Sequence, residues 1–140
     1  MATRRRSIPT GRAPSAPYRR PVRREEDQLH AAVAALLRIL LPPRKVLWFH
    51  VPNQGRRSPR TGAQLRRMGM LPGVADLILL WDGRAYFIEL KSRSGRLSPE
   101  QIGFANAAQD VGCRYATCRS LDDVETKLVE WGIIPEERRN

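Results

Sequence analysis

The sequence predicts a single α/β domain with a mixed β-sheet flanked by helices, in the order α-β-β-β-α-β-α. The dipeptide Asp82-Gly83 is a strong hairpin signal, and it joins two apolar runs of strand-like composition. A capped helix that begins at Ser98 separates the second run from a further strand-like segment. Such a crossover helix makes the last strand pair parallel, so the sheet is mixed. With 140 residues, the chain is long enough for one hydrophobic core.

The N-terminal half is predicted to contain one helix, one strand and a long basic connection. The helix spans Glu25–Leu41, because leucine and valine recur at helical spacing and two prolines follow. A strand is predicted over Lys45–Val51. The connection over residues 52–72 contains glycine and proline, with a short helix near Ala63–Met68.

The C-terminal half alternates strands and helices. The capping box Ser98-Pro99-Glu100-Gln101 opens one helix, and Gly112 ends it. The predicted elements are the hairpin strands Val74–Trp81 and Arg84–Lys91, the helix after Ser98, a strand at Cys113–Cys118 and a last helix from Ser120 to Trp131.

The hairpin register places three charged side chains together. In a two-residue turn Trp81 faces Arg84, and stepping outward along both strands puts Asp76 opposite Glu89. Lys91 is two residues beyond Glu89 and shares its face. Facing carboxylates repel each other, whereas a hard divalent cation with oxygen ligands would hold them together. The register therefore points to metal-dependent chemistry.

Two other interpretations of these charges remain open from the sequence. A bulge in the turn would slip the register by one residue and separate the carboxylates. The three residues could also be solvated charges at strand ends. The apolar run from Leu77 to Leu80 and the nearly continuous one around Phe87 favour strands buried on both faces. Charges at the mouth of a buried sheet are more often functional than charges on an open one.

The charge distribution predicts a nucleic-acid partner. The formal net charge is +11. Residues 1–24 contain eight arginines, four prolines and no acid, so we expect a disordered basic tail there, a globular domain over residues 25–134 and a short tail over 135–140. Eight further basic residues and no acid occur from Gln28 to Ala75. A basic segment that runs into a carboxylate cluster indicates a phosphate-binding surface beside a metal site.

Composition also bears on the compartment. No run approaches the roughly 18 apolar residues that span a membrane, and the arginine-rich N-terminus lacks the apolar region of a secretory signal. An organellar transit peptide has a similar composition and stays an alternative. Cys113 and Cys118 have no companion pair, so zinc is not expected, and reduced thiols fit a cytoplasmic protein.

One acidic residue lies on the apolar stripe of the first helix. Glu26 stands three residues before Leu29 and seven before Val33, so it extends the core-facing side of the helix. A functional carboxylate explains this position. Stabilisation of the helix dipole by Glu25, Glu26 and Asp27 explains it equally well.

Six short motifs follow one another along the chain: Glu26-x-x-Leu29, His50-Val-Pro-Asn53, Arg66-Arg-Met-Gly69, Pro72-Gly-Val-Ala-Asp76, Phe87-Ile-Glu-Leu-Lys91 and Gly95-Arg-Leu-Ser-Pro-Glu-Gln101. This ordered series resembles the PD-(D/E)xK nuclease superfamily and, within it, the VRR-NUC family. The resemblance covers roughly residues 25 to 132, and Ala75 and His30 stand where that family usually has proline and glutamine.

The resemblance implies a restriction-endonuclease-like fold and a role for each site residue. Asp76, Glu89 and the backbone carbonyl of Leu90 would hold Mg²⁺ or Mn²⁺, and Glu26 would approach from the first helix. Lys91 would orient or deprotonate the attacking water, or offset charge on the phosphate. Products would carry 5′-phosphate and 3′-hydroxyl ends.

Further residues are expected around this centre. Gln101 matches a position near the family's site, although the capping box alone also explains a glutamine there. A second group would contact nucleic acid, unless it is only a solvated basic loop: Asn53, Gln54, Arg56, Arg57, Arg60, Arg66 and Arg67.

The sequence as a whole predicts a Mg²⁺- or Mn²⁺-dependent deoxyribonuclease, an endonuclease specific for branched or junction DNA that acts as a homodimer. A basic nucleic-acid-binding module that keeps the fold without catalysis is the alternative. Intact Asp76, Glu89 and Lys91 favour the enzyme. An interaction protein that uses its tryptophans is the weakest interpretation, because all three lie at core-like positions.

Overall fold

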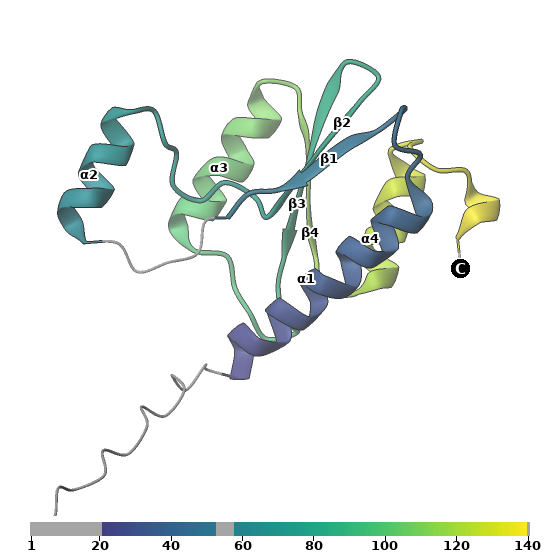
Figure 1. Ribbon diagram of the computed structural model, residues 1–140, viewed down its shortest axis with the longest axis horizontal. Helices are drawn as coiled ribbons and strands as arrows, with labels where there is room; N and C mark the ends of the chain where they lie inside the picture. Colours follow the sequence, from purple (N-terminus) through teal and green to yellow (C-terminus); the bar gives the residue numbers. More distant parts are fainter. Residues whose placement is uncertain (1–20, 53–57, 140) are drawn as a thin grey trace, which may run out of the picture.

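The computed structural model describes residues 21–52 and 58–139, which form one four-stranded sheet with helices on both faces (Figure 1). The elements follow the chain as α1 (Pro21–Leu40), β1 (Leu47–His50), α2 (Pro59–Arg67), β2 (Leu77–Trp81), β3 (Arg84–Leu90), α3 (Pro99–Asp110), β4 (Arg114–Cys118), α4 (Leu121–Glu130) and the short 3₁₀ helix η1 (Glu136–Arg138). The predicted order is confirmed, with α2 as the expected extra helix in the basic connection.

The sheet is mixed, as predicted. Its strand order is β1-β2-β3-β4, in which β1, β2 and β3 are antiparallel neighbours and β4 pairs parallel with β3. Trp81 faces Arg84 and Leu77 faces Ile88, so the two-residue hairpin register is confirmed and no bulge shifts it. Asp82 and Gly83 both have positive φ, of 48° and 69°, as this turn type requires.

The main core lies between one face of the sheet and the pair α1 and α4. Side chains from α1, β2, β3, β4 and α4 are fully or almost fully buried there: Val33, Leu37, Leu77, Leu79, Ile88, Leu90, Cys118, Val124 and Leu128. The opposite face of β3 and β4 is covered by α3, where Phe104 contacts Phe87 edge to face at 5.0 Å. Helices therefore cover both faces at the β3–β4 side.

The prediction that the hairpin strands are buried on both faces is wrong for the β1–β2 side of the sheet. Leu47, Phe49 and Leu80 are 60%, 43% and 39% exposed. Their pairing in β1 and β2 places them on the face that α3 covers only over β3 and β4. The apolar run of β2 thus reflects one buried face and one open face.

Two predicted helix boundaries also need correction. The first helix begins at Pro21 rather than Glu25, so residues 21–24 are helical rather than part of a tail, and residues 1–20 lie outside the described chain. Proline suits the first turn of a helix, because its missing N–H has no intrahelical partner there. The short helix spans Pro59–Arg67 instead of Ala63–Met68, since the Ser58 side chain accepts a hydrogen bond from the Thr61 N–H and caps it.

Candidate active site

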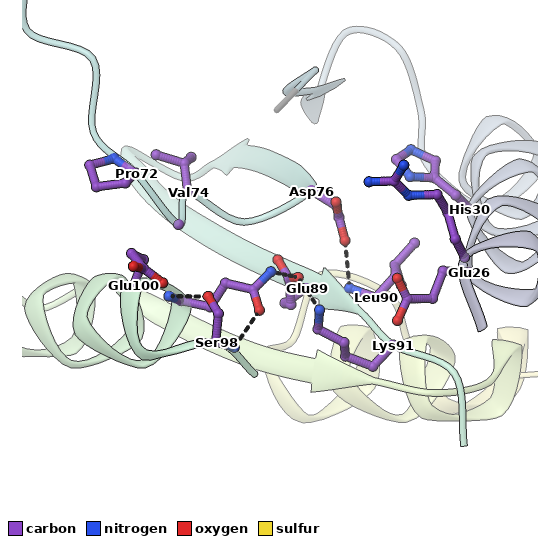
Figure 2. Close-up of a pocket in the computed structure, with 13 residues that line it drawn as sticks. Glu26, His30, Pro72, Val74, Asp76, Glu89, Leu90, Lys91, Ser98 and Glu100 are labelled. Carbon is purple, nitrogen blue, oxygen red and sulfur yellow. Dashed lines mark hydrogen bonds and ion pairs between the residues drawn. The ribbon is translucent and has the colours of Figure 1, made fainter. Parts of the chain in front are cut away.

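The pocket that contains the predicted site lies at the end of the β2–β3 hairpin that is farther from the Asp82-Gly83 turn (Figure 2). It has a volume of about 370 Å³. Its walls come from α1, the segment before β2, the end of β3 and the start of α3, and the lining residues are Arg23, Glu26, His30, Pro72, Gly73, Val74, Asp76, Glu89, Leu90, Lys91, Ser98, Glu100 and Gln101.

Asp76 is fixed by hydrogen bonds from three sides. Its backbone carbonyl accepts the Val51 N–H at 2.9 Å and lies 2.9 Å from Nδ1 of His50. Its side-chain Oδ2 accepts the Leu90 N–H at 2.8 Å. The backbone pairing of β2 with β3 ends at Leu77, and the side chain of Asp76 then holds its carboxylate against the backbone of β3 beside Glu89.

Glu89 is a buried carboxylate in which one of the two oxygens accepts no hydrogen bond from the described residues. The residue is only 2% exposed. Oε1 accepts the Gln101 Nε2–H at 2.6 Å and lies 3.5 Å from Nζ of Lys91, whereas Oε2 has no hydrogen-bond partner among the described residues. Burial first, and the nearby Asp76 second, raise the pKa of Glu89 to about 7, and Lys91 opposes this shift. A buried oxygen of this kind calls for a proton or a cation.

Lys91 lies on the same face as Glu89, as the strand periodicity predicts. It follows the last residue of β3 and extends the parallel pairing, since its N–H donates to the Cys118 carbonyl at 3.0 Å. Although it is a lysine, it is only 9% exposed. Its ammonium group is held at the pocket rather than in solvent, as Figure 2 shows.

Gln101 performs both of the roles that the sequence left open. Its Oε1 accepts the Ser98 N–H at 2.8 Å, which completes the capping box of α3. Its Nε2 donates to Glu89. A glutamate would cap the helix equally well, but its carboxylate could not donate to a second carboxylate. The choice of glutamine is therefore explained by the site.

Glu26, rather than Glu25, faces the pocket. Glu26 is half-buried and its Oε1 accepts the Ser92 N–H at 3.4 Å, whereas Glu25 is exposed. A Cβ on Gly95 would come within 2.9 Å of the same oxygen. The loop after β3 thus packs closely on the Glu26 carboxylate and fixes its position at the rim of the pocket.

Several residues of the site were not predicted. Arg23 lines the pocket because α1 begins earlier than expected, one helical turn before Glu26. His30 lines it too and contacts His50 edge to face at 4.2 Å, and burial and then His50 lower the pKa of His30. Arg119 braces the loop after β3, donating to the carbonyls of Ser92 and Gly95 at 2.6 Å each. Only the helical spacing of Arg23 and His30 around Glu26 could have indicated their place.

The donor set is suited to a hard divalent cation with an incomplete protein shell. Within residues 21–52 and 58–139, no group of three His, Cys, Asp or Glu side chains is spaced to hold a metal ion. Mg²⁺ in phosphate-processing sites commonly uses one or two carboxylates, and water and substrate phosphate supply the rest. Asp76, the unpartnered oxygen of Glu89 and the Leu90 carbonyl match that smaller set.

The predicted nucleic-acid residues divide into two groups. Arg60, Arg66 and Arg67 lie on α2, exposed and away from the pocket lining. The other four positions fall outside the described residues, namely Asn53, Gln54, Arg56 and Arg57.

The two cysteines are free thiols, with Cys118 in the core. No helix in the described part of the chain is long and apolar enough to cross a membrane.

Comparison with known proteins agrees with this geometry. Two solved structures share the fold at 18% sequence identity each. One, a "VRR_NUC domain protein", superposes with a TM-score of 0.61 over 79% of this chain and 89% of its own. The other, a "VRR_NUC domain", gives 0.50 over 76% and 95%. No curated protein sequence matches the chain.

Family assignment rests on the sequence match rather than on these superpositions. The VRR-NUC domain matches residues 25–122, which include the helix of Glu26, the carboxylates of the hairpin, Lys91 and Gln101. This chain therefore belongs to the VRR-NUC domain family of nucleases.

Proposed function

We propose that this protein is a metal-dependent deoxyribonuclease whose active site is the pocket between Asp76, Glu89 and Lys91. The observation that carries the proposal is the buried Glu89 carboxylate, with one unpartnered oxygen and a second carboxylate beside it. Burying such a group is costly unless a ligand uses it. A purely structural strand end gives no reason for that cost.

The cation site would be formed by Asp76, Glu89 and the carbonyl of Leu90. Gln101 keeps Oε1 of Glu89 occupied, so the buried and unpartnered Oε2 would be the oxygen that binds the cation. A bound Mg²⁺ or Mn²⁺ would supply Lewis acidity toward the scissile phosphate. Glu26, which lines the pocket from α1, would contribute directly or through a water.

Lys91 would act on the attacking water or on the phosphate. Its ammonium group lies in the pocket, 3.5 Å from Glu89, and is shielded from bulk solvent. A cation in that position can hold and orient a water and can offset charge that develops on phosphorus. Either role explains a lysine in a position where most lysines would be exposed.

The nuclease activity is tested by cleavage of labelled linear and branched DNA with Mg²⁺, Mn²⁺ or EDTA. We expect the wild-type protein to cut DNA only when Mg²⁺ or Mn²⁺ is present. We expect the Glu89→Gln variant not to cut DNA. Gln101→Glu is a matched variant. It keeps the cap of α3, but it replaces the amide that donates to Glu89 by a carboxylate that repels Glu89. Metal-independent cutting, or cutting by Glu89→Gln at the wild-type rate, would refute the site assignment. Metal-free DNA binding with no cleavage of any substrate would favour the catalytically inactive module.

We also propose that the protein cuts branched or junction DNA as a homodimer. One chain offers one such pocket and no separate recognition domain among its described residues. A two-fold dimer would set two sites against a branched substrate, and such symmetry is the commonest among oligomers. Sedimentation at micromolar concentration tests the dimer. A monomer that cuts linear single strands as fast as four-way junctions would refute both parts.

A further inference from the structure

Among the α-helices of the described residues, α2 is the one with no buried residue. Figure 1 shows it at the far left, beyond α3 and separate from the layers around the sheet. Only Gly62 and Leu65 of its nine residues are even half-buried. Such a helix contributes little to the core, so its composition is free to serve another purpose.

Three polar side chains form a stripe along its outer face. Arg60, Gln64 and Arg67 have the spacing i, i+4 and i+7, which places them on one side of a helix. At about 100° per residue, this stripe is directly opposite the half-buried Gly62 and Leu65. All three side chains are exposed. We call these three residues the α2 stripe.

The chemistry of the α2 stripe matches the edges of bases. Arginine donates two hydrogen bonds to the O6 and N7 atoms of guanine, and glutamine pairs in the same way with adenine. Ala63 lies beside the stripe, exposed and small enough for close approach. No acidic residue occurs from Gln28 to Ala75, so nothing in this segment repels the phosphates that flank a groove. A helix that only tracked phosphates would not need an amide at the centre of its stripe.

The segment after α2 connects the stripe directly to the active site. Pro72 and Gly73 line the pocket, and Gly73, with φ of +76°, lies so close to Glu100 that a Cβ would be 2.3 Å from its backbone. Five residues lie between Arg67 and Gly73, so their Cα atoms are at most about 22 Å apart. The distance from the α2 stripe to the pocket is therefore no longer than about one turn of duplex DNA, roughly 34 Å.

We propose that α2 enters the major groove of duplex DNA beside the cut and directs Arg60, Gln64 and Arg67 to base edges. The inference rests on the proposed nuclease function and adds to it the form of nucleic acid that the helix reads. A major groove is wide enough to admit an α-helix, whereas the minor groove of B-DNA is not.

The test compares two duplexes of one sequence, in EDTA, with the full-length wild-type chain. In one duplex every purine is replaced by its 7-deaza analogue, which removes the N7 acceptor from the major groove and leaves the phosphates and base pairing in place. Binding is measured by fluorescence anisotropy. We expect the unmodified duplex to bind about tenfold more tightly, the size of a few lost base contacts.

Adjacent arginines provide a matched pair of variants. Arg67→Ala removes a charge on the α2 stripe, and Arg66→Ala removes the same charge from another side of the helix. Arg67→Ala should reduce the discrimination between the duplexes at least about threefold, and Gln64→Ala should do so without any change of charge. Arg66→Ala should weaken binding to both duplexes equally and keep their ratio. Circular dichroism checks that each variant is folded.

The outcomes separate this inference from the proposed function. Equal affinity of the wild-type chain for both duplexes, with metal-dependent cutting intact, would overturn the groove assignment alone. Equal loss of discrimination in Arg66→Ala and Arg67→Ala would overturn the assignment of the stripe. Discrimination by a protein that cuts no DNA would leave the groove contact standing and refute the nuclease. Absence of binding to either duplex would also overturn the groove contact, and the cleavage assay with Mg²⁺ or Mn²⁺ would decide the nuclease function separately.

Discussion

The pocket and α2 are built in opposite ways, although only five residues lie between the last residue of α2, Arg67, and Gly73 in the pocket wall. In the pocket, Glu89 and Lys91 are 2% and 9% exposed, and Glu89 accepts a 2.6 Å hydrogen bond from Gln101 and lies 3.5 Å from the Lys91 ammonium group. In α2, no residue is buried and the arginines extend into solvent. Chemistry at a phosphate depends on groups fixed before the substrate arrives, whereas binding a polyanion depends on reach and hydrated charge.

The largest predicted effect is at Asp76, which tests whether the pocket is a metal centre at all. Asp76→Asn keeps an acceptor for the Leu90 N–H but loses the charge. We expect it to fold normally and to lose at least about 10³-fold in cleavage rate, because a metal ion contributes several kcal/mol to such reactions. Asp76→Ala should be as inactive and also less stable by about 1–3 kcal/mol, since that N–H is left unpaired. Cleavage by Asp76→Asn at the wild-type rate would contradict the assignment.

Lys91→Met should separate catalysis from metal binding. The methionine keeps the length of the buried stem and removes the ammonium group. We expect a loss of about 10²–10⁴-fold in turnover, the size of a general acid–base or charge-stabilising role, with nearly unchanged Mn²⁺ affinity measured by calorimetry. A fall in metal affinity that matches the fall in rate would instead assign Lys91 a structural role.

The pH dependence of stability should report the burial of Glu89. Its pKa in the folded protein, about 7, is above its ordinary value of 4.5, so ionisation opposes folding. Without metal, its contribution to stability is intact below pH 4.5 and is lost as the pH rises through 7. The loss is roughly 3 kcal/mol. Urea unfolding in EDTA at pH 4.5 and pH 8 measures it, and Glu89→Gln should remove this part of the difference. Identical pH profiles of stability for the two proteins would show that burial does not raise the pKa of Glu89.

The smallest predicted effect tests whether α2 folds together with the core. Gly62 in α2 and Gly103 in α3 are both helical, and a Cβ on either would have no atom within 4 Å. Alanine at either position favours its helix by about 0.5–1 kcal/mol. Gly103→Ala should raise the melting temperature by about 2–6 °C, whereas Gly62→Ala should leave it unchanged and only increase helical content. An equal rise for both variants would remove the contrast between α2 and the core.

The sequence predicted the parts of the site that depend on local geometry. A two-residue turn determines the register of its hairpin, so Asp76, Glu89 and Lys91 could be placed together before the fold was known. The capping box gave the start of α3 and, with it, the position of Gln101. Both are short-range rules, which tertiary packing did not alter here.

The errors concern features that depend on packing between distant elements. Whether β2 is covered on its second face depends on where α3 lies, which the pattern of Leu77–Leu80 does not contain. The hydrogen bonds from Arg119 to the carbonyls of Ser92 and Gly95 join residues that are far apart in sequence. The start of α2 was missed for another reason, because Ser58-Pro59 is the same kind of cap as Ser98-Pro99 but no apolar stripe follows it.

The close packing of Gly73 on α3 has a consequence for how such enzymes diversify. Because a Cβ at this position would overlap the Glu100 backbone, the chain is pinned just before it enters the pocket. Changes in length or composition between Pro52 and Leu71 should therefore not shift the backbone beyond Gly73, and Asp76 should keep its position. If α2 contacts the substrate as we propose, the segment around it could be replaced to change substrate preference without moving the groups of the pocket.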